Sequence, residues 1–119
     1  MSFSLTDTYS DTLFYPLKNA IEFAEEEGVL IISSAGNNSL DNDDFSNTSL
    51  PSSFQSDNII AVSSLDANAN LSSFSNFGSQ TVDVAIYAEG IAGPGLFQDI
   101  VYHSGTSQAA ALILSLIHI

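Results

Sequence analysis

Hydrophobic residues first recur at intervals of three and four positions, as on one face of a helix. The residues with this spacing are Leu17, Ala20, Ile21 and Ala24. Pro16 suits the first turn of such a helix, and Gly28 suits the position just after its end. The pattern therefore predicts an amphipathic helix of about three turns between these two residues. The polar, turn-rich segment 6–16 before it is expected to be a surface connection.

Continuous runs of branched apolar residues follow the predicted helix. Such runs are typical of parallel strands that are covered on both faces. They lie at 29–32, 58–62 and 81–88, with a shorter run at 100–102. A Gly-Pro loop is expected at 93–95, and an apolar helix from Ser107 to Ile113. Because helix and buried strands alternate, the sequence predicts an α/β fold with a mostly parallel sheet flanked by helices.

The charge of the chain is almost entirely negative. Lys18 is the only basic residue among 119, against fourteen acidic residues, and the formal net charge is −13. Because contacts with phosphate groups depend on lysine and arginine, we expect neither nucleic acid nor an anionic membrane as a partner. The absence of cysteine excludes disulfides and thiolate zinc sites. No stretch has the length of a membrane-spanning helix, and no signal peptide is visible.

The candidate chemistry lies at two separate turns. Ser107 stands directly after the small turn Gly105-Thr106 and before helix-forming alanines, where backbone N–H groups and the helix dipole stabilise negative charge. Much earlier, the apolar strand ends in a Gly-Asn turn that holds the amide of Asn37 at the sheet edge. A nucleophilic serine and an amide donor are two of the groups that acyl transfer needs. The alternatives are a helix N-cap serine and a turn asparagine.

The general base that would activate Ser107 is not evident. His103 lies four residues before it, but the strand and turn between them should point the imidazole away from the hydroxyl. The other histidine, His118, lies in the segment 114–119, which is identical to the translation of a widely used transposase adapter. We therefore expect 114–119 to be an adapter-derived tail, the alternative being an apolar end of the last helix. Residues 1–113 are then one truncated domain.

Several motifs follow one another in an order that resembles the catalytic domain of subtilisin-like serine peptidases (subtilases). They are Ala-Gly-Asn after an apolar strand, Ile-Ile-Ala-Val, Phe-Ser-Asn-Phe-Gly, Val-Asp-Val and Ser-Gly-Thr-Ser-x-Ala. The resemblance covers the chain from Met1 to about Ile113 and corresponds to the C-terminal part of that domain. It implies a serine endopeptidase in which Ser107 is the nucleophile. The Ser107 N–H and the Asn37 side chain would then hold the oxyanion.

The resemblance also implies a binding site for an extended protein or peptide substrate. The residues that would bind the substrate are Ser2, Phe3 and Ser4 on an edge strand, and Ser34, Ala35 and Gly36 on the opposite wall of the specificity pocket. Pro51 matches a proline that is often cis in the family. Asp83 matches a position that helps to ligate a cation in some members, the alternative being a capping carboxylate. Asp41, Asp43 and Asp44 are expected to form a solvated acidic loop rather than a calcium loop.

In subtilases the triad runs in the order aspartate, histidine, serine along the chain. The first two would lie upstream of Met1, so we expect a fragment that retains the nucleophile and is inactive alone. No cofactor is required for this chemistry, although structural calcium is possible in the parent protein. The resemblance implies an extracellular or cell-surface protein. The alternative function is a non-catalytic subtilase-like domain that binds peptide by strand pairing.

Overall fold

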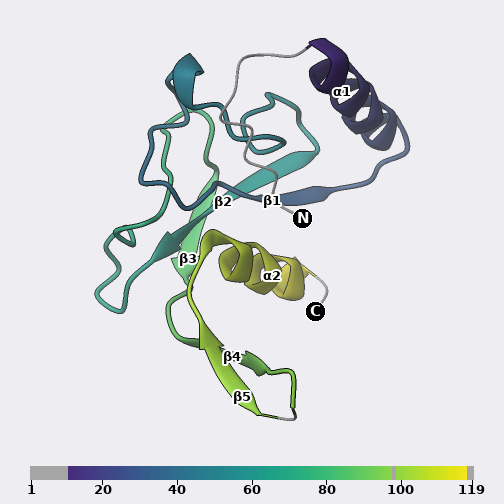
Figure 1. Cartoon of the computed structure of the whole chain (residues 1–119). Helices are drawn as coiled ribbons and strands as arrows, with labels where there is room; N and C mark the ends of the chain where they lie inside the picture. Colours follow the sequence, from purple (N-terminus) through teal and green to yellow (C-terminus); the bar gives the residue numbers. More distant parts are fainter. Residues whose placement is uncertain (1–10, 98, 118–119) are drawn as a thin grey trace.

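Three parallel strands form a sheet in the order β1 (Ile31–Ser34), β2 (Ile59–Leu65), β3 (Val84–Tyr87), as Figure 1 shows. Ile31 is paired with Ile59, and Val62 with Val84. This computed structural model describes residues 11–97 and 99–117, with side chains from residue 14 onward. The predicted α/β class with a mostly parallel sheet is confirmed.

Helix α2 (Thr106–Ile117) packs across all three strands of this sheet (Figure 1). The centre of the contact is formed by Val62, Ala88 and Ala109, none of which is exposed to solvent. The partly buried residues around them are Ile32, Ile60, Ile86, Ile91, Ala110 and Ile113. Because both alanines are small, the helix can approach the sheet closely, and this holds the start of α2 near the carboxyl ends of the strands.

Strand β1 lies two residues later than the sequence pattern predicts. Val29 and Leu30 are exposed, and the strand ends in the buried serines Ser33 and Ser34. The reason lies in Asn58, whose Nδ2 donates to the carbonyl of Val29 and so fixes it outside the ladder. The carbonyl of Asn58 in turn accepts from the N–H of Ile31, where pairing begins.

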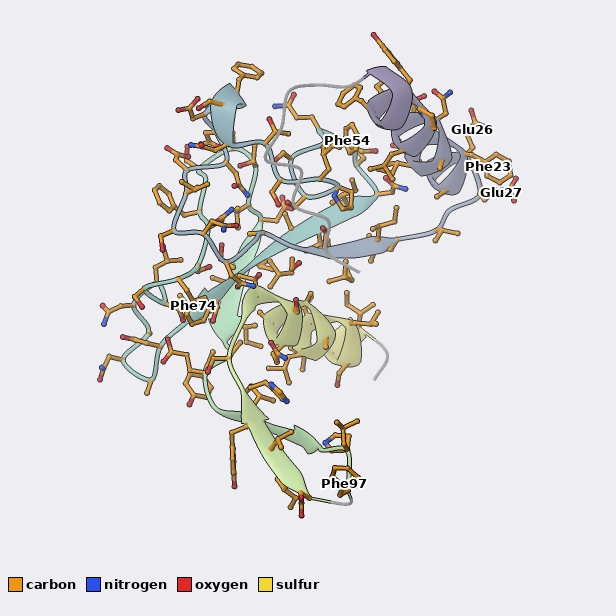
Figure 2. All side chains as sticks on the ribbon, viewed as in Figure 1. Phe23, Glu26, Glu27, Phe54, Phe74 and Phe97 are labelled. Atoms are coloured by element: carbon orange, nitrogen blue, oxygen red, sulfur yellow. The ribbon has the colours of Figure 1, made fainter. Side chains whose placement is uncertain are left out.

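Helix α1 (Asp11–Glu26) begins earlier than predicted, so that Pro16 lies inside it rather than in its first turn. The expectation that 6–16 is only a surface connection is therefore wrong for its second half. The ring of Phe14 packs against Phe54 at a centroid distance of 5.1 Å, which extends the apolar side of the helix toward its N-terminus. Gly28 ends the helix with φ +70°, as predicted. Figure 2 shows Phe54 beneath this helix.

The chain between β3 and α2 forms a hairpin of two antiparallel strands, β4 (Ile91–Pro94) and β5 (Ile100–His103). The sequence pattern predicts only a loop at 93–95. β4 forms because its partner β5 supplies the ladder, and it is a strand despite its Gly-Pro sequence. The hairpin projects away from the sheet, with Phe97 at its tip (Figures 1 and 2). At its base β5 leads directly into the turn before α2.

The long polar loop after β1 contains one short 3-10 helix, η1 (Phe45–Asn47), and a cis peptide bond between Leu50 and Pro51. The cis proline agrees with the expectation for Pro51. Within the described residues, neither helix has the length and apolar character needed to span a membrane. Residues 114–117 continue α2, and the proposed adapter origin of 114–119 remains a prediction.

Candidate active site

Two segments that are distant in the sequence meet at the carboxyl end of β1. Asn37 follows β1, and Thr106 is the first residue of α2. The Oδ1 atom of Asn37 accepts a hydrogen bond from the backbone N–H of Thr106 at 2.9 Å and another from its hydroxyl at 3.0 Å. The first N–H groups of a helix have no partner within the helix, so Asn37 supplies an acceptor to the start of α2. The loop after β1 thereby caps the last helix.

These bonds fix the orientation of the Asn37 amide. Since Oδ1 faces Thr106, the two N–H groups of Nδ2 must face the other way. Nδ2 donates to no described residue, and the Asn37 side chain is exposed. A Cβ placed on Gly105 would lie 3.7 Å from both Oδ1 and Nδ2, so the amide lies directly against the turn before Ser107. The structure therefore places the Asn37 amide beside the turn that precedes Ser107.

Ser107 lies in the first turn of α2, with an exposed side chain. Neither its N–H nor its hydroxyl is hydrogen-bonded to any of the described residues. The turn that carries it is held by Gly105, whose N–H donates to the carbonyl of Ala88 at 3.1 Å. Backbone N–H groups at a helix start form a site for an oxyanion, and Ser107 N–H occupies such a position.

No base contacts the Ser107 hydroxyl in the described part of the chain. His103 is exposed on β5, where its backbone pairs with that of Ile91, and no hydrogen bond joins it to Ser107. A serine hydroxyl without an adjacent base is a weak nucleophile. The described residues therefore place no general base beside the Ser107 hydroxyl.

The residues expected to form one wall of the specificity pocket lie at the end of β1, and their role remains a prediction. Ser34, Ala35 and Gly36 are buried at the end of β1. Gly36 has φ +113°, and its N–H donates to the Thr106 hydroxyl at 3.2 Å. The second predicted substrate element, Ser2, Phe3 and Ser4, lies outside the described residues.

The sequence matches the model of one protein family, the subtilase family, over residues 1–116. The chain belongs to the subtilase family. A thermophilic serine proteinase of Bacillus sp. (strain AK1) is 35% identical to it over 100 residues, which are 84% of this chain and 23% of that protein. This subtilase chain therefore spans less than a quarter of that relative's length.

Solved structures of subtilisin-like proteases share the fold of this subtilase chain. The prenylagaramide maturation protease PagA is 22% identical with a TM-score of 0.73, over 95% of this chain and 37% of PagA. The PatG macrocyclase, solved with a peptide, is 25% identical with a TM-score of 0.74, over 97% of this chain and 32% of that structure. The chain covers less than half of either structure.

Asp83, the candidate cation ligand, lies just before β3. Its Oδ2 accepts from the N–H of Ala61 at 2.8 Å, which ties the start of β3 to β2. Among the described residues, no three acidic or histidine side chains are grouped so that they could hold a metal ion. The role of Asp83 as a cation ligand remains a prediction.

Asp43, which was expected in a solvated acidic loop, also joins two loops of the subtilase chain through hydrogen bonds. Its carboxylate accepts from the N–H and hydroxyl groups of Ser79 and Thr81 and from the N–H of Gln80, at 2.7 to 3.2 Å. These bonds, above all that from the Thr81 hydroxyl, lower the pKa of Asp43 to about 2. The loop that begins with Asn37 is thereby attached to the segment before β3.

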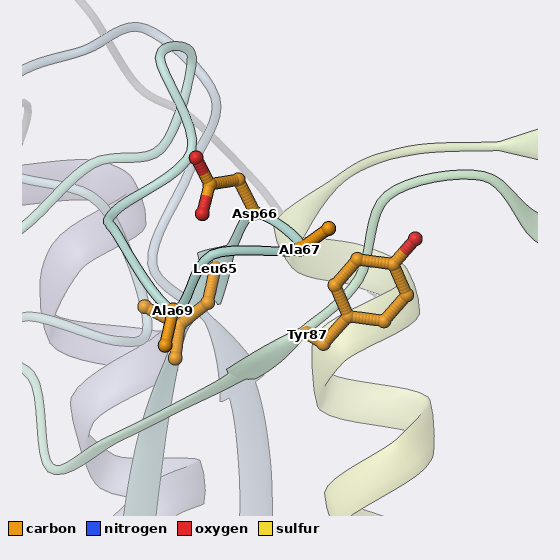
Figure 3. A pocket seen from close by; sticks show the side chains of 5 residues that line it. All are labelled: Leu65, Asp66, Ala67, Ala69 and Tyr87. Carbon is orange, nitrogen blue, oxygen red and sulfur yellow. The ribbon is translucent and has the colours of Figure 1, made fainter.

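A shallow pocket of about 360 Å³ lies where β2 and β3 end, at the same edge of the sheet as Asn37. It is lined by Leu65, Asp66, Ala67, Ala69 and Tyr87, as Figure 3 shows. The Asp66 carboxylate accepts from the N–H groups of Asn68 and Asn70, so it closes its own turn. This pocket contributes no group to the site at Ser107.

Sequence reasoning missed two residues that shape the site, Thr106 and Asn76. Thr106 is fully buried and bonds both Gly36 and Asn37, and Asn76 is 2% exposed and bonds the loop after Asn37. Both residues stand inside motifs that identify the family, but no local pattern shows which way their side chains point. Only the tertiary arrangement reveals these contacts.

Proposed function

We propose that this chain is the part of a serine endopeptidase that carries the nucleophile and the oxyanion donors. The observation that supports it is the Asn37–Thr106 contact. Because Thr106 holds Oδ1 of Asn37, the Nδ2 donor is left facing outward beside Gly105, close to the turn that presents Ser107. A donor preorganised next to a serine at a helix start is the arrangement that acyl transfer requires.

In the proposed reaction, the Ser107 hydroxyl attacks the carbonyl carbon of a peptide bond. The negative charge that develops on the carbonyl oxygen is held by the N–H of Ser107 and by Nδ2 of Asn37. A histidine outside these 119 residues takes the serine proton and gives it to the leaving amine, oriented by an aspartate that is also outside them. Water then hydrolyses the acyl-enzyme. In this step the histidine takes a proton from the water and gives it back to the serine oxygen. No cofactor takes part in these steps.

The proposed substrate is an extended protein or peptide segment. The wall Ser34–Ala35–Gly36 would lie along one side of a substrate side chain, and residues 2–4 would pair with the substrate backbone. We further propose an extracellular or cell-surface location, in keeping with family members that are secreted. Structural calcium remains a proposal for the whole protein. Nucleic acid and anionic membranes are not proposed as partners, since the net charge is −13.

A second function is a domain that binds peptide without cleaving it. It is favoured by one observation: the Ser107 hydroxyl has no hydrogen bond to a described residue, and no base lies beside it. The two functions share the binding wall and differ only in the histidine and aspartate that complete the triad.

The test uses the full-length protein that carries this chain, with a fluorescence-quenched peptide and a serine-directed phosphonate. We expect hydrolysis and phosphonylation at Ser107, both lost in Ser107→Ala. The 119-residue chain alone should show neither at a useful rate, because it lacks the base. Peptide binding without hydrolysis or phosphonylation in the full-length protein would favour the second function instead.

A further inference from the structure

We propose that Asn76, on the loop between β2 and β3, is a positioning residue that sets the oxyanion amide of Asn37. This inference rests on the proposed function. Asn76 is 2% exposed and touches no group that would react. It acts through the backbone on both sides of Asn37, and a second buried amide, Asn42, completes the contact.

The oxygen of the Asn76 side chain holds the chain just after Asn37. Oδ1 accepts from the N–H of Asn38 at 2.8 Å and from the N–H of Leu40 at 3.2 Å. Both donors lie in the loop that leaves β1. A single buried oxygen therefore fixes the direction in which this loop departs, and with it the direction in which the Asn37 side chain leaves the backbone.

The nitrogen of the same amide holds the chain just before Asn37. Nδ2 of Asn76 donates to Oδ1 of Asn42 at 3.0 Å, and Nδ2 of Asn42 donates to the carbonyl of Ala35 at 2.9 Å. Asn42 is 4% exposed. Since Oδ1 of Asn76 must face two N–H groups, its Nδ2 must face Asn42, and the orientation of both amides is determined. The hydrogen-bonded pair Asn76–Asn42, here called the relay, therefore connects Ala35 on one side of Asn37 with Asn38 on the other.

The backbone of Asn76 is itself anchored to the sheet. Its N–H donates to the carbonyl of Gly36 at 2.9 Å, and its carbonyl accepts from the Ser63 hydroxyl of β2 at 2.7 Å. A Cβ on Gly36 would lie 2.6 Å from Nδ2 of Asn76, so the amide is packed directly against Gly36. Asn76 thus links strand β2 of the sheet to Gly36, the residue that precedes Asn37.

These contacts set what can replace Asn76. Alanine leaves the N–H groups of Asn38 and Leu40 without their buried acceptor. Aspartate keeps that acceptor but places a second oxygen against Oδ1 of Asn42. Only an amide satisfies both ends, which is why the position needs asparagine rather than a polar residue in general.

The experiment is a double-mutant cycle in the full-length protein, with kcat measured per titrated active site so that unfolded molecules are not counted. We expect Asn76→Ala to lower kcat by about tenfold to a hundredfold with little change in KM, because misplacing a catalytic group by about 1 Å has effects of this order. In an Asn37→Leu background the same change should lower kcat by less than about threefold, since the donor is already gone. Asn42→Ala should behave in the same way from the other side of the amide.

The matched control is Asn58→Ala. Asn58 is likewise a buried asparagine, and its Nδ2 donates to the carbonyls of Ile21 and Val29. It lies just before β2 and holds the connection between α1 and β1. The Asn58→Ala variant should have a lower melting temperature, while its kcat per titrated site stays near that of the wild type. Equal losses of kcat from Asn76→Ala with and without Asn37 would overturn the inference and leave the proposed function intact. A wild-type protein without peptidase activity would overturn both.

Discussion

The side-chain oxygen of Asn37 accepts the backbone N–H of Thr106 at 2.9 Å, across 69 residues of sequence. Because of this bond, the oxygen and the nitrogen of the Asn37 amide face in different directions. Its oxygen caps α2, and its nitrogen is the proposed donor to the oxyanion. The start of the helix that carries Ser107 and the proposed oxyanion donor are therefore joined, and a change at Thr106 or at Asn37 affects the other residue.

Asn37→Leu removes the donor while keeping a similar volume. In the full-length protein we expect kcat to fall by about two to three orders of magnitude, with little change in KM, because the donor is aimed at the developing oxyanion. This magnitude is the one known for an oxyanion-hole amide in subtilisin itself. Active-site titration with steady-state kinetics measures it.

If Asn37 is only a turn and capping residue, the same change should lower the melting temperature and leave kcat per titrated site within about threefold of wild type. A melting curve recorded beside the kinetics separates the two roles. Because Asn37 also caps α2, we expect some loss of stability in either case. The value of kcat per titrated site therefore decides between the capping role and the oxyanion-donor role of Asn37.

Thr106→Val tests the other partner of this bond. Valine has nearly the shape of threonine, but it leaves the buried N–H of Gly36 without its acceptor and removes one of the two bonds to Asn37. We expect the free energy of unfolding to fall by about 1–3 kcal/mol. Urea denaturation measures it, and Thr106→Ser, which keeps the hydroxyl, should recover most of the loss. Equal losses in both variants would mean that the methyl group, not the hydroxyl, matters.

The roles of Asn37 and Ser107 remain predictions, whereas the parallel sheet and the last helix were predicted from the sequence and are confirmed. The two confirmed predictions succeed because buried parallel strands and helix caps have local patterns that can be recognised in a single sequence. The start of β1 could not be predicted in this way. Val29 and Leu30 have the composition of a strand, yet the amide of Asn58 holds the carbonyl of Val29 outside the ladder.

The relay behind the site was also beyond local patterns. Asn42 and Asn76 stand in polar loops, where asparagine is ordinarily a turn residue. They are buried only because the two loops pack against each other over the end of β1. Similarly, β4 exists through its pairing with β5, and a Gly-Pro sequence alone predicts a loop.

Gly36→Ala should be severely destabilising. At φ +113° an L-residue is strained, and the added Cβ would lie 2.6 Å from Nδ2 of Asn76. The matched control is Gly28→Ala, because Gly28 also has a positive φ, +70°, but no atom lies within 4 Å of its Cβ position. We expect about 1 kcal/mol of lost stability at Gly28 and at least about twice that at Gly36. Equal losses, measured by urea denaturation, would show that Asn76 does not press on Gly36.

Asp43→Asn should destabilise the protein in a way that depends on pH. The donors of Ser79, Gln80 and Thr81 lower the pKa of Asp43 from 3.8 to about 2, so the folded state favours the ionised carboxylate. A lowered pKa contributes stability that is fully present above the unfolded value and is lost as pH falls through the folded value. The difference in melting temperature between wild type and Asp43→Asn should therefore be largest above about pH 5 and shrink between about pH 4 and pH 2.

Asp57→Asn is the control, because Asp57 is exposed and its carboxylate bonds no described residue. We expect Asp57→Asn to change the melting temperature less than Asp43→Asn does. A difference for Asp43→Asn that stays constant down to pH 2 would show that the loops are not joined through this carboxylate.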